Sequence, residues 1–166
     1  MFELELKFII FFANVVLLAV PISIFEILIE KDKGWSSGVP ENKWYRSTVG
    51  RNNYFVKLIT SIAGVPYFSA YHVLMFFLFL PLVVLIENLF IFHNLLLAIS
   101  IYFGILVFED FFWFIFNWYF PALQELLKGP EGNIWWHTRW IKIFGRYYLP
   151  KSYLSIIGVV VLLLIS

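Results

Sequence analysis

The chain has 166 residues, of which 61% are hydrophobic, 22% are aromatic and only 14% are charged. A soluble domain is about 45–50% apolar, and a fold of this size could not bury so much apolar surface, so the composition indicates an integral membrane protein. The formal net charge of +1 excludes a global field that attracts nucleic acid, and the lack of cysteine excludes disulfides, thiolate zinc sites and cysteine nucleophiles.

Four apolar segments predict four membrane-spanning helices. The first covers about residues 7–30; it exceeds the apolar core of a signal peptide and suits a span of roughly 20 residues. Residues 67–90 and 93–118 form the second and third spans, which the very short connection between them predicts to be antiparallel. The fourth, residues 152–166, is short for a span. We therefore expect one domain, residues 1–166, with the fold of an all-α four-transmembrane-helix bundle.

The basic residues predict the orientation of this bundle. Most Lys and Arg residues lie in the connections 31–66 and 119–151, which four spans place on one side of the membrane. The positive-inside rule makes that side cytoplasmic. Both termini are then predicted to face outward from the cell membrane, which is the inner or plasma membrane if the chain is prokaryotic.

Both cytoplasmic loops contain segments predicted to be amphipathic and interfacial. NYFVKLITSIAG (53–64) has its large apolar residues on one helical face, and PALQELLKGP (121–130) has the proline and glycine that bound a short helix. NIWWHTRWIKIFGRYY (133–148) mixes tryptophan and tyrosine with basic residues, as at a membrane surface. Four arginines are predicted to contact lipid headgroups or the phosphate of a lipid substrate: Arg46, Arg51, Arg139 and Arg146.

Two adjacent acids, Glu109 and Asp110, interrupt the third span. An ionised Asp at the centre of a spanning helix costs about 2.5–3.5 kcal/mol, and a short carboxylate cannot reach the interface as Lys or Arg does. The two acids must therefore face the bundle interior or a wet cavity, be protonated, or be paired. Asn117 lies seven residues after Asp110, on the same helical face.

Histidines at the same depth suggest a metal site at the cytoplasmic boundary of the membrane. His72 falls in the first turns of the second span, and His137 lies in the tryptophan-rich loop. We predict His72, Glu109, Asp110 and His137 as ligands of a divalent Zn, Mn or Fe ion, with Asp110, Glu109 and Asn117 as catalytic residues acting on a lipid-borne ester or phosphate. Without a metal, an Asp–His pair could transfer protons.

Other interpretations remain open, and the sequence does not decide whether the protein is an enzyme. The same polar groups could simply connect helices, with Glu26 and Glu30 as ordinary residues near a helix end. The protein would then be a non-catalytic subunit or helix-packing module of a homo-oligomer or larger membrane complex. A third hypothesis is an oligomeric ion or proton pathway. In all three the lipid bilayer is a partner and nucleic acid is not.

Overall fold

The computed structural model describes residues 2–166 and is dominated by helices. Three helices are long and apolar enough to cross a membrane: Glu3–Glu30, Ala70–Phe92 and Leu95–Phe116. The first is most of α1 (Phe2–Glu30) and the last is α5 (Leu95–Phe116). These elements are consistent with an all-α membrane protein, as the composition predicts.

The second long apolar helix, Ala70–Phe92, is a rod built from α-helical and π-helical parts. It consists of α3 (Ala70–His72), the π-helical η2 (Val73–Phe79), α4 (Leu80–Glu87) and the π-helical η3 (Asn88–Phe92). Pro81 lacks an N–H, and the Leu80 N–H before it bonds to the Met75 carbonyl, five residues back. The Tyr102 hydroxyl donates a hydrogen bond of 3.1 Å to the Phe76 carbonyl in this loosened stretch. The π-helical stretch begins directly after His72.

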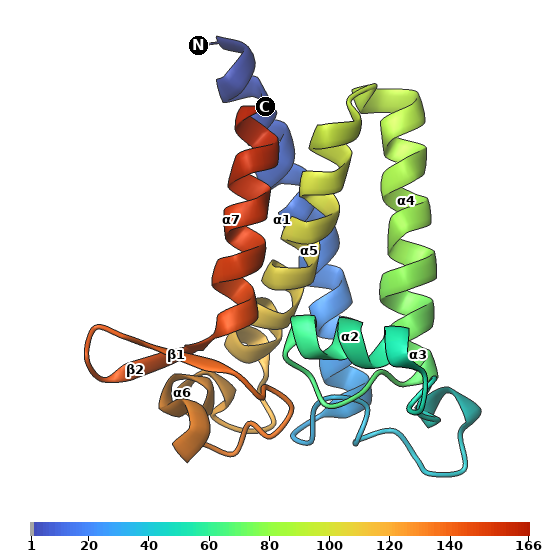
Figure 1. Ribbon diagram of the computed structural model, residues 1–166, viewed down its shortest axis with the longest axis vertical. Helices are drawn as coiled ribbons and strands as arrows, with labels where there is room; N and C mark the ends of the chain where they lie inside the picture. The colour runs from blue at the N-terminus through green and yellow to red at the C-terminus, as the bar shows by residue number, and fades with distance from the viewer. Residues whose placement is uncertain (1) are drawn as a thin grey trace.

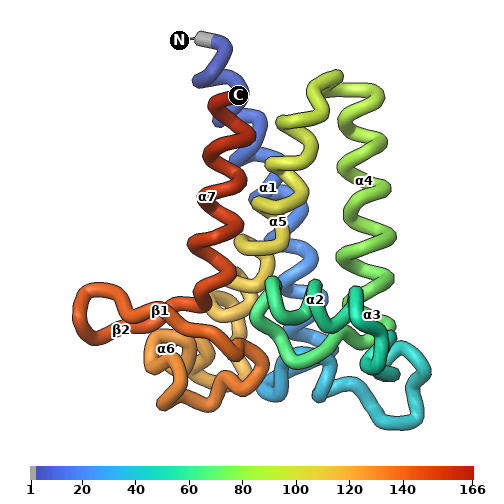
Figure 2. The backbone as a smooth tube through the Cα atoms, in the orientation of Figure 1, coloured from blue at the N-terminus to red at the C-terminus, as the bar shows by residue number. Residues whose placement is uncertain are grey.

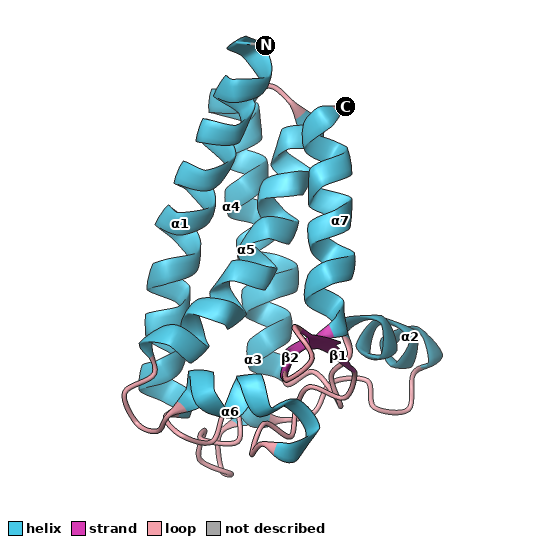
Figure 3. Ribbon diagram, turned by 90° about the vertical axis from the view of Figure 1, so that its left-hand side faces the viewer, coloured by secondary structure: helices cyan, strands magenta, loops and turns pink. Residues whose placement is uncertain are grey.

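Helix α5 lies at the centre of the bundle, between α1 and α7 (Lys151–Ile165) on one side and the α3–α4 rod on the other (Figures 1 and 3). Its close contact with α1 depends on Gly104, because a Cβ there would lie 2.7 Å from the Phe11 ring. Val15, Ile101 and Ile105 are fully buried around this contact. Helix α7 is apolar but has only 15 residues, fewer than the three long helices.

Apart from the short connection between η3 and α5, the connections gather at the end of the bundle opposite both termini (Figures 1 and 2). They contain η1 (Trp44–Arg46), α2 (Tyr54–Ala63), α6 (Ala122–Lys128), η4 (Gly129–Glu131), β1 (Trp140–Ile143) and β2 (Tyr147–Pro150). The helices predicted within 53–64 and 121–130 thus form as α2 and α6. The segment 133–148 instead contains part of an antiparallel hairpin, in which Trp140 pairs with Pro150.

A second apolar core lies at this end of the bundle. It joins the last turns of α1 and α5 to α6 and to the segment before β1, through buried Ile27, Trp113, Phe114, Leu126 and Trp136. The Phe114 and Trp136 rings stack with centroids 5.9 Å apart and planes 6° apart. Because of this packing, the segment 133–140 lies against the ends of α1 and α5. His137, within that segment, is buried, and only 6% of the residue is exposed.

Candidate functional site

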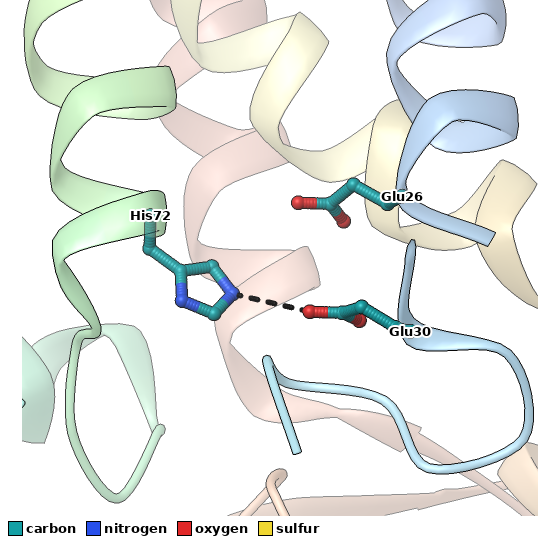
Figure 4. Close-up of side chains that lie close together, drawn as sticks. All are labelled: Glu26, Glu30 and His72. Atoms are coloured by element: carbon teal, nitrogen blue, oxygen red, sulfur yellow. Dashed lines mark ion pairs between the residues drawn. The ribbon is translucent and has the colours of Figure 1, made fainter. Parts of the chain in front are cut away.

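Two glutamates at the end of α1 face His72 of the second rod (Figure 4). Glu26 and Glu30 are one helical turn apart and therefore share a face. Together with His72 they offer three ligand atoms that all lie within 4.8 Å of one another. The residues are 6%, 2% and 1% exposed, respectively. Two carboxylates and an imidazole thus converge in the interior of the bundle.

The His72 ring is held on three sides. Ser69 Oγ lies 2.7 Å from its Nδ1, the Trp35 ring stacks on it with centroids 4.1 Å apart, and Phe76 stacks at 5.9 Å. The remaining nitrogen, Nε2, lies 3.8 Å from Glu30 Oε1. A ring fixed at Nδ1 with Nε2 free toward carboxylates has the arrangement common in metal-binding histidines.

The loop after α1 adopts a conformation that L-residues rarely take. Lys31, Gly34, Trp35 and Ser36 have φ of 56°, 56°, 46° and 59°. A left-handed backbone costs a non-glycine residue roughly 1–2 kcal/mol, and such strain concentrates at functional sites. Here it turns the Trp35 ring onto His72 and directs the Ser36 N–H to donate to Glu30 Oε1. The loop therefore positions two groups of the cluster.

Glu26 connects this cluster to the acids of α5. The Tyr71 hydroxyl donates a hydrogen bond of 2.8 Å to Glu26 Oε1, and the Glu26 and Glu109 carboxyl groups contact each other. Two carboxyl groups in contact need a shared proton or a cation, because two adjacent buried negative charges repel strongly. Glu109 is 2% exposed, and its Oε1 has no hydrogen-bond partner within the described residues.

Asp110 belongs to a separate group of side chains from three elements. His137 Nε2, from the segment before β1, lies 3.1 Å from Asp110 Oδ2. The Tyr153 hydroxyl, from α7, donates a hydrogen bond to the same oxygen. A histidine beside a carboxylate is an arrangement suited to proton transfer.

One pocket of about 270 Å³ is lined by Glu26 and Glu30 of the first group and by Asp110 and His137 of the second. Its polar wall includes Glu26, Glu30, Glu109, Asp110 and His137, and the rest is largely apolar and aromatic. Among the described residues that line the pocket, none is Lys or Arg. The described lining of the pocket therefore has four acidic side chains and one histidine.

The geometry and chemistry of Glu26, Glu30 and His72 fit a hard or borderline divalent metal. Ligands bound at about 2.1 Å lie at most about 4.2 Å apart, so the 3.8 Å between His72 Nε2 and Glu30 Oε1 is compatible with a shared ion. The three ligand atoms lie up to 4.8 Å apart, so they must move together by less than about an ångström to bind one ion. Within residues 2–166 this is the one group of three or more ligand-type residues with such spacing.

The predicted site residues are thus divided between two neighbouring groups. His72 lies with Glu26 and Glu30, Glu109 contacts Glu26, and Asp110 lies with His137. Glu26 and Glu30 were not among the predicted metal ligands, although Glu26 was expected at the depth of His72 and the one-turn spacing of the two glutamates gives them a common face. Nothing in the sequence relates Tyr153 to Asp110.

The Asn117 side chain connects the end of α5 to the backbone just after α1 by hydrogen bonding. Asn117 follows the last residue of α5, its Nδ2 donates a hydrogen bond of 2.7 Å to the Lys31 carbonyl, and its Oδ1 accepts one of 2.9 Å from the Tyr119 N–H. Its predicted catalytic role remains a prediction.

The predicted headgroup arginines have varied surroundings. Arg46 donates to the Val39 carbonyl at 2.9 Å and pairs with Glu41 at 3.5 Å. Arg139 donates to Ser61 Oγ at 2.9 Å, and the Arg146 guanidinium lies 4.7 Å from the Tyr147 ring centroid. Lipid contact by these residues and by the exposed Arg51 remains a prediction.

Comparisons of the chain with protein-family models, curated proteins and solved structures found no match.

Proposed function

We propose that this protein is a multi-pass membrane protein that binds one divalent metal ion through Glu26, Glu30 and His72 at the cytoplasmic end of four spanning helices. Helix α7 supplies the fourth span. Its 15 residues cover about 22 Å of a hydrocarbon layer about 30 Å thick, and the aromatic residues of β2 before it extend its reach. The positive-inside rule assigns the loop end, where the cluster lies, to the cytoplasm.

The convergence of three buried ligand groups from two apolar helices carries this proposal. Burying a carboxylate without compensation costs several kcal/mol, and here several carboxyl groups share one pocket without Lys or Arg among its lining residues. A divalent cation would compensate the charge of Glu26 and Glu30. Zn, Mn and Fe suit this donor set of carboxylate and imidazole.

The same pocket supports an enzymatic role on a lipid-borne substrate. A bound divalent ion would polarise an ester or phosphate oxygen or activate water. In this proposal His137, whose Nε2 lies 3.1 Å from Asp110 Oδ2, accepts or returns a proton in the same pocket. Glu109 lies between the two groups and touches Glu26. The apolar walls favour a substrate that arrives from the bilayer.

Metal content of the purified protein tests the proposal. We expect about one equivalent of Zn, Mn or Fe by elemental analysis, and a loss of at least about tenfold in affinity for Glu30→Gln and His72→Ala. His93→Asn is the matched histidine control, because His93 is exposed and its φ of 50° suits Asn. Glu41→Gln is the control for an exposed acid.

Retention of the metal in folded Glu30→Gln and His72→Ala protein would overturn the proposal. A helix-packing role in a homo-oligomer or larger membrane complex would then explain the cluster, and so would an oligomeric proton pathway. Titration of the metal-free protein with Zn²⁺ or Mn²⁺ covers the case in which the ion is lost during purification. Failure to bind either ion at micromolar concentration would also contradict the site.

A further inference from the structure

The pocket beside the metal cluster has an apolar side that the metal proposal does not use. Its walls come from α2, η2, α5 and α7, with side chains that include Ile59, Phe76, Phe103, Leu106 and Ile156. Ile62 and Phe77, which also line it, are 70% and 44% exposed. The pocket therefore opens to the apolar surroundings of the helices, from which a hydrocarbon chain can enter.

The size of the pocket favours a ligand with one hydrocarbon chain. Its volume of about 270 Å³ lies just below the roughly 300–1,000 Å³ of small-molecule sites. A single-chain amphiphile suits this space better than a two-chain phospholipid.

The polar end offers both a donor and acceptors that no protein group satisfies. Trp113 Nε1, Glu109 Oε1 and His137 Nδ1 are buried without a hydrogen-bond partner in the described chain, and all three residues line this pocket. Their side chains belong to residues that are only 2%, 2% and 6% exposed. Buried polar groups are almost always paired, so the three groups together indicate a ligand that both donates and accepts hydrogen bonds.

The charges of the lining residues restrict which polar group the ligand can carry. Among the described lining residues there are four acids and neither Lys nor Arg, which disfavours a carboxylate or phosphate away from the metal. An ammonium group donates but cannot accept, so it cannot satisfy the Trp113 N–H. A hydroxyl group carries no charge. Its one O–H can donate to the Glu109 carboxylate, and its two lone pairs can accept from the Trp113 N–H and from a protonated nitrogen of the His137 ring.

We infer that the pocket binds a long-chain alcohol, with its hydroxyl group among Trp113, Glu109 and His137 and its chain between α2, η2, α5 and α7. This inference rests on the proposed function, which places the pocket in a membrane beside a metal, and it names the substrate class. The hydroxyl end lies in the same pocket as Glu26 and Glu30, and His137 with its partner Asp110 lies beside it.

Photo-crosslinking in phosphatidylcholine nanodiscs tests this inference. The probes are a long-chain alcohol that carries a diazirine and the carboxylic acid and amine of the same chain length. We expect the alcohol to label peptides of α5 and α7, and unlabelled alcohol to compete at least about tenfold better than the acid or the amine. Equal labelling by the three probes would overturn the inference.

Three variants test the placement of the alcohol. Trp113→Phe keeps an aromatic ring and removes the N–H, so we expect about five- to tenfold weaker labelling. Ile156→Trp fills the pocket and should abolish labelling. Leu82→Trp adds the same side chain on the exposed face of α4 and should change nothing. Unchanged labelling in both Trp113→Phe and Ile156→Trp protein that is folded would contradict the proposed position.

Metal analysis of the same nanodisc samples separates the two proposals. Protein with its full metal content that shows no preference for the alcohol would overturn only the ligand inference. Protein that binds the alcohol selectively but holds no metal would overturn only the metal site.

Discussion

Ser69 Oγ lies 2.7 Å from His72 Nδ1, and this contact leaves Nε2 of the same ring directed at Glu30, 3.8 Å away. The hydroxyl thereby selects which nitrogen of the histidine is available to a ligand. Ser69 is fully buried, so the contact is protected from water. Similar outer contacts orient metal-binding histidines in other proteins.

Ser69→Ala is therefore expected to weaken Zn²⁺ or Mn²⁺ binding by about 10–100-fold, as loss of such an outer contact typically does. The measurement is a metal titration of detergent-solubilised protein. Ser155→Ala is the matched control, because the exposed Ser155 hydroxyl bonds only to the Lys151 carbonyl of its own helix. Equal affinity in the two variants would show that Ser69 does not position the ring.

Gly38→Ala is expected to disturb the loop that holds Glu30. A Cβ at position 38 would lie 2.3 Å from the Glu30 backbone oxygen, which belongs to the end of α1 and cannot simply rotate away. Overpacking of this kind costs typically 1–3 kcal/mol. We expect a lower melting temperature in detergent and weaker metal binding, since the same loop carries the Ser36 N–H that donates to Glu30.

Gly158→Ala is the matched control for that substitution. A Cβ at position 158, in α7, meets no atom within 4 Å, and alanine favours a helix. Stability as high in Gly38→Ala as in Gly158→Ala would contradict the close contact.

Asn117→Ala distinguishes a packing role from a catalytic one. The substitution removes the hydrogen bond to the Lys31 carbonyl, which links the end of α5 to the residue after α1. We expect the free energy of unfolding to fall by about 1–3 kcal/mol. We expect metal stoichiometry to be retained, because both polar atoms of the side chain are engaged with backbone groups. Elemental analysis and thermal denaturation provide the two measurements, with the exposed Asn52→Ala as control. Metal loss without loss of stability would assign Asn117 to the site.

Glu125 gives the loop end a specific acid sensitivity. Its Oε1 accepts a hydrogen bond of 2.6 Å from Lys128 Nζ, and its Oε2 accepts from the backbone N–H and the Nδ2 of Asn133, both at 2.9 Å. The Lys128 hydrogen bond is the first cause that lowers the pKa of Glu125 below its ordinary value of 4.5. A lowered folded-state pKa stabilises the fold above the ordinary value, and that contribution disappears as the pH falls through the folded-state pKa.

We therefore expect faster amide exchange at Asn133 as the pH falls below about 4.5, after correction for the intrinsic pH dependence of exchange. Glu125→Gln should show the faster exchange already at about pH 7 and lose the acid-dependent step. Glu131→Gln, which changes an exposed acid in the same loop region, serves as the control. An acid-dependent step of the same size in Glu125→Gln would assign it to another group.

Much of the helical architecture could be predicted because it depends on local sequence. Long apolar runs form helices in which every interior backbone group is satisfied, so the three long helices follow from composition and length. The short connection at residues 93–94 makes the second and third helices antiparallel, and Asn94 accepts from the Leu97 N–H at the start of α5. The hairpin over residues 140–150 does not follow from local sequence in this way, because its turn depends on positive φ at residues 144 and 145, in the middle of an aromatic segment.

The composition of the site could be predicted only in part, because it depends on helix rotation. Glu109 and Asp110 are adjacent, but successive residues on a helix point about 100° apart, and each joins a different group: Glu26 on one side and His137 on the other. The residue pattern within α5 does not indicate which neighbouring element faces Glu109 and which faces Asp110. The close approach of α1 at Gly104 and the packing of Trp136 on Phe114 decide that.

The amino-acid sequence alone dictates apolar helices with a few polar residues buried among them, because hydrophobicity and helix periodicity are properties of neighbouring residues. The packing of the folded chain sets which groups meet: Glu26 and Glu30 face His72, and Asp110 faces His137 and Tyr153. Such encounters depend on the packing of side chains far apart in the chain, since contact between two helices is set by the shapes of both surfaces together.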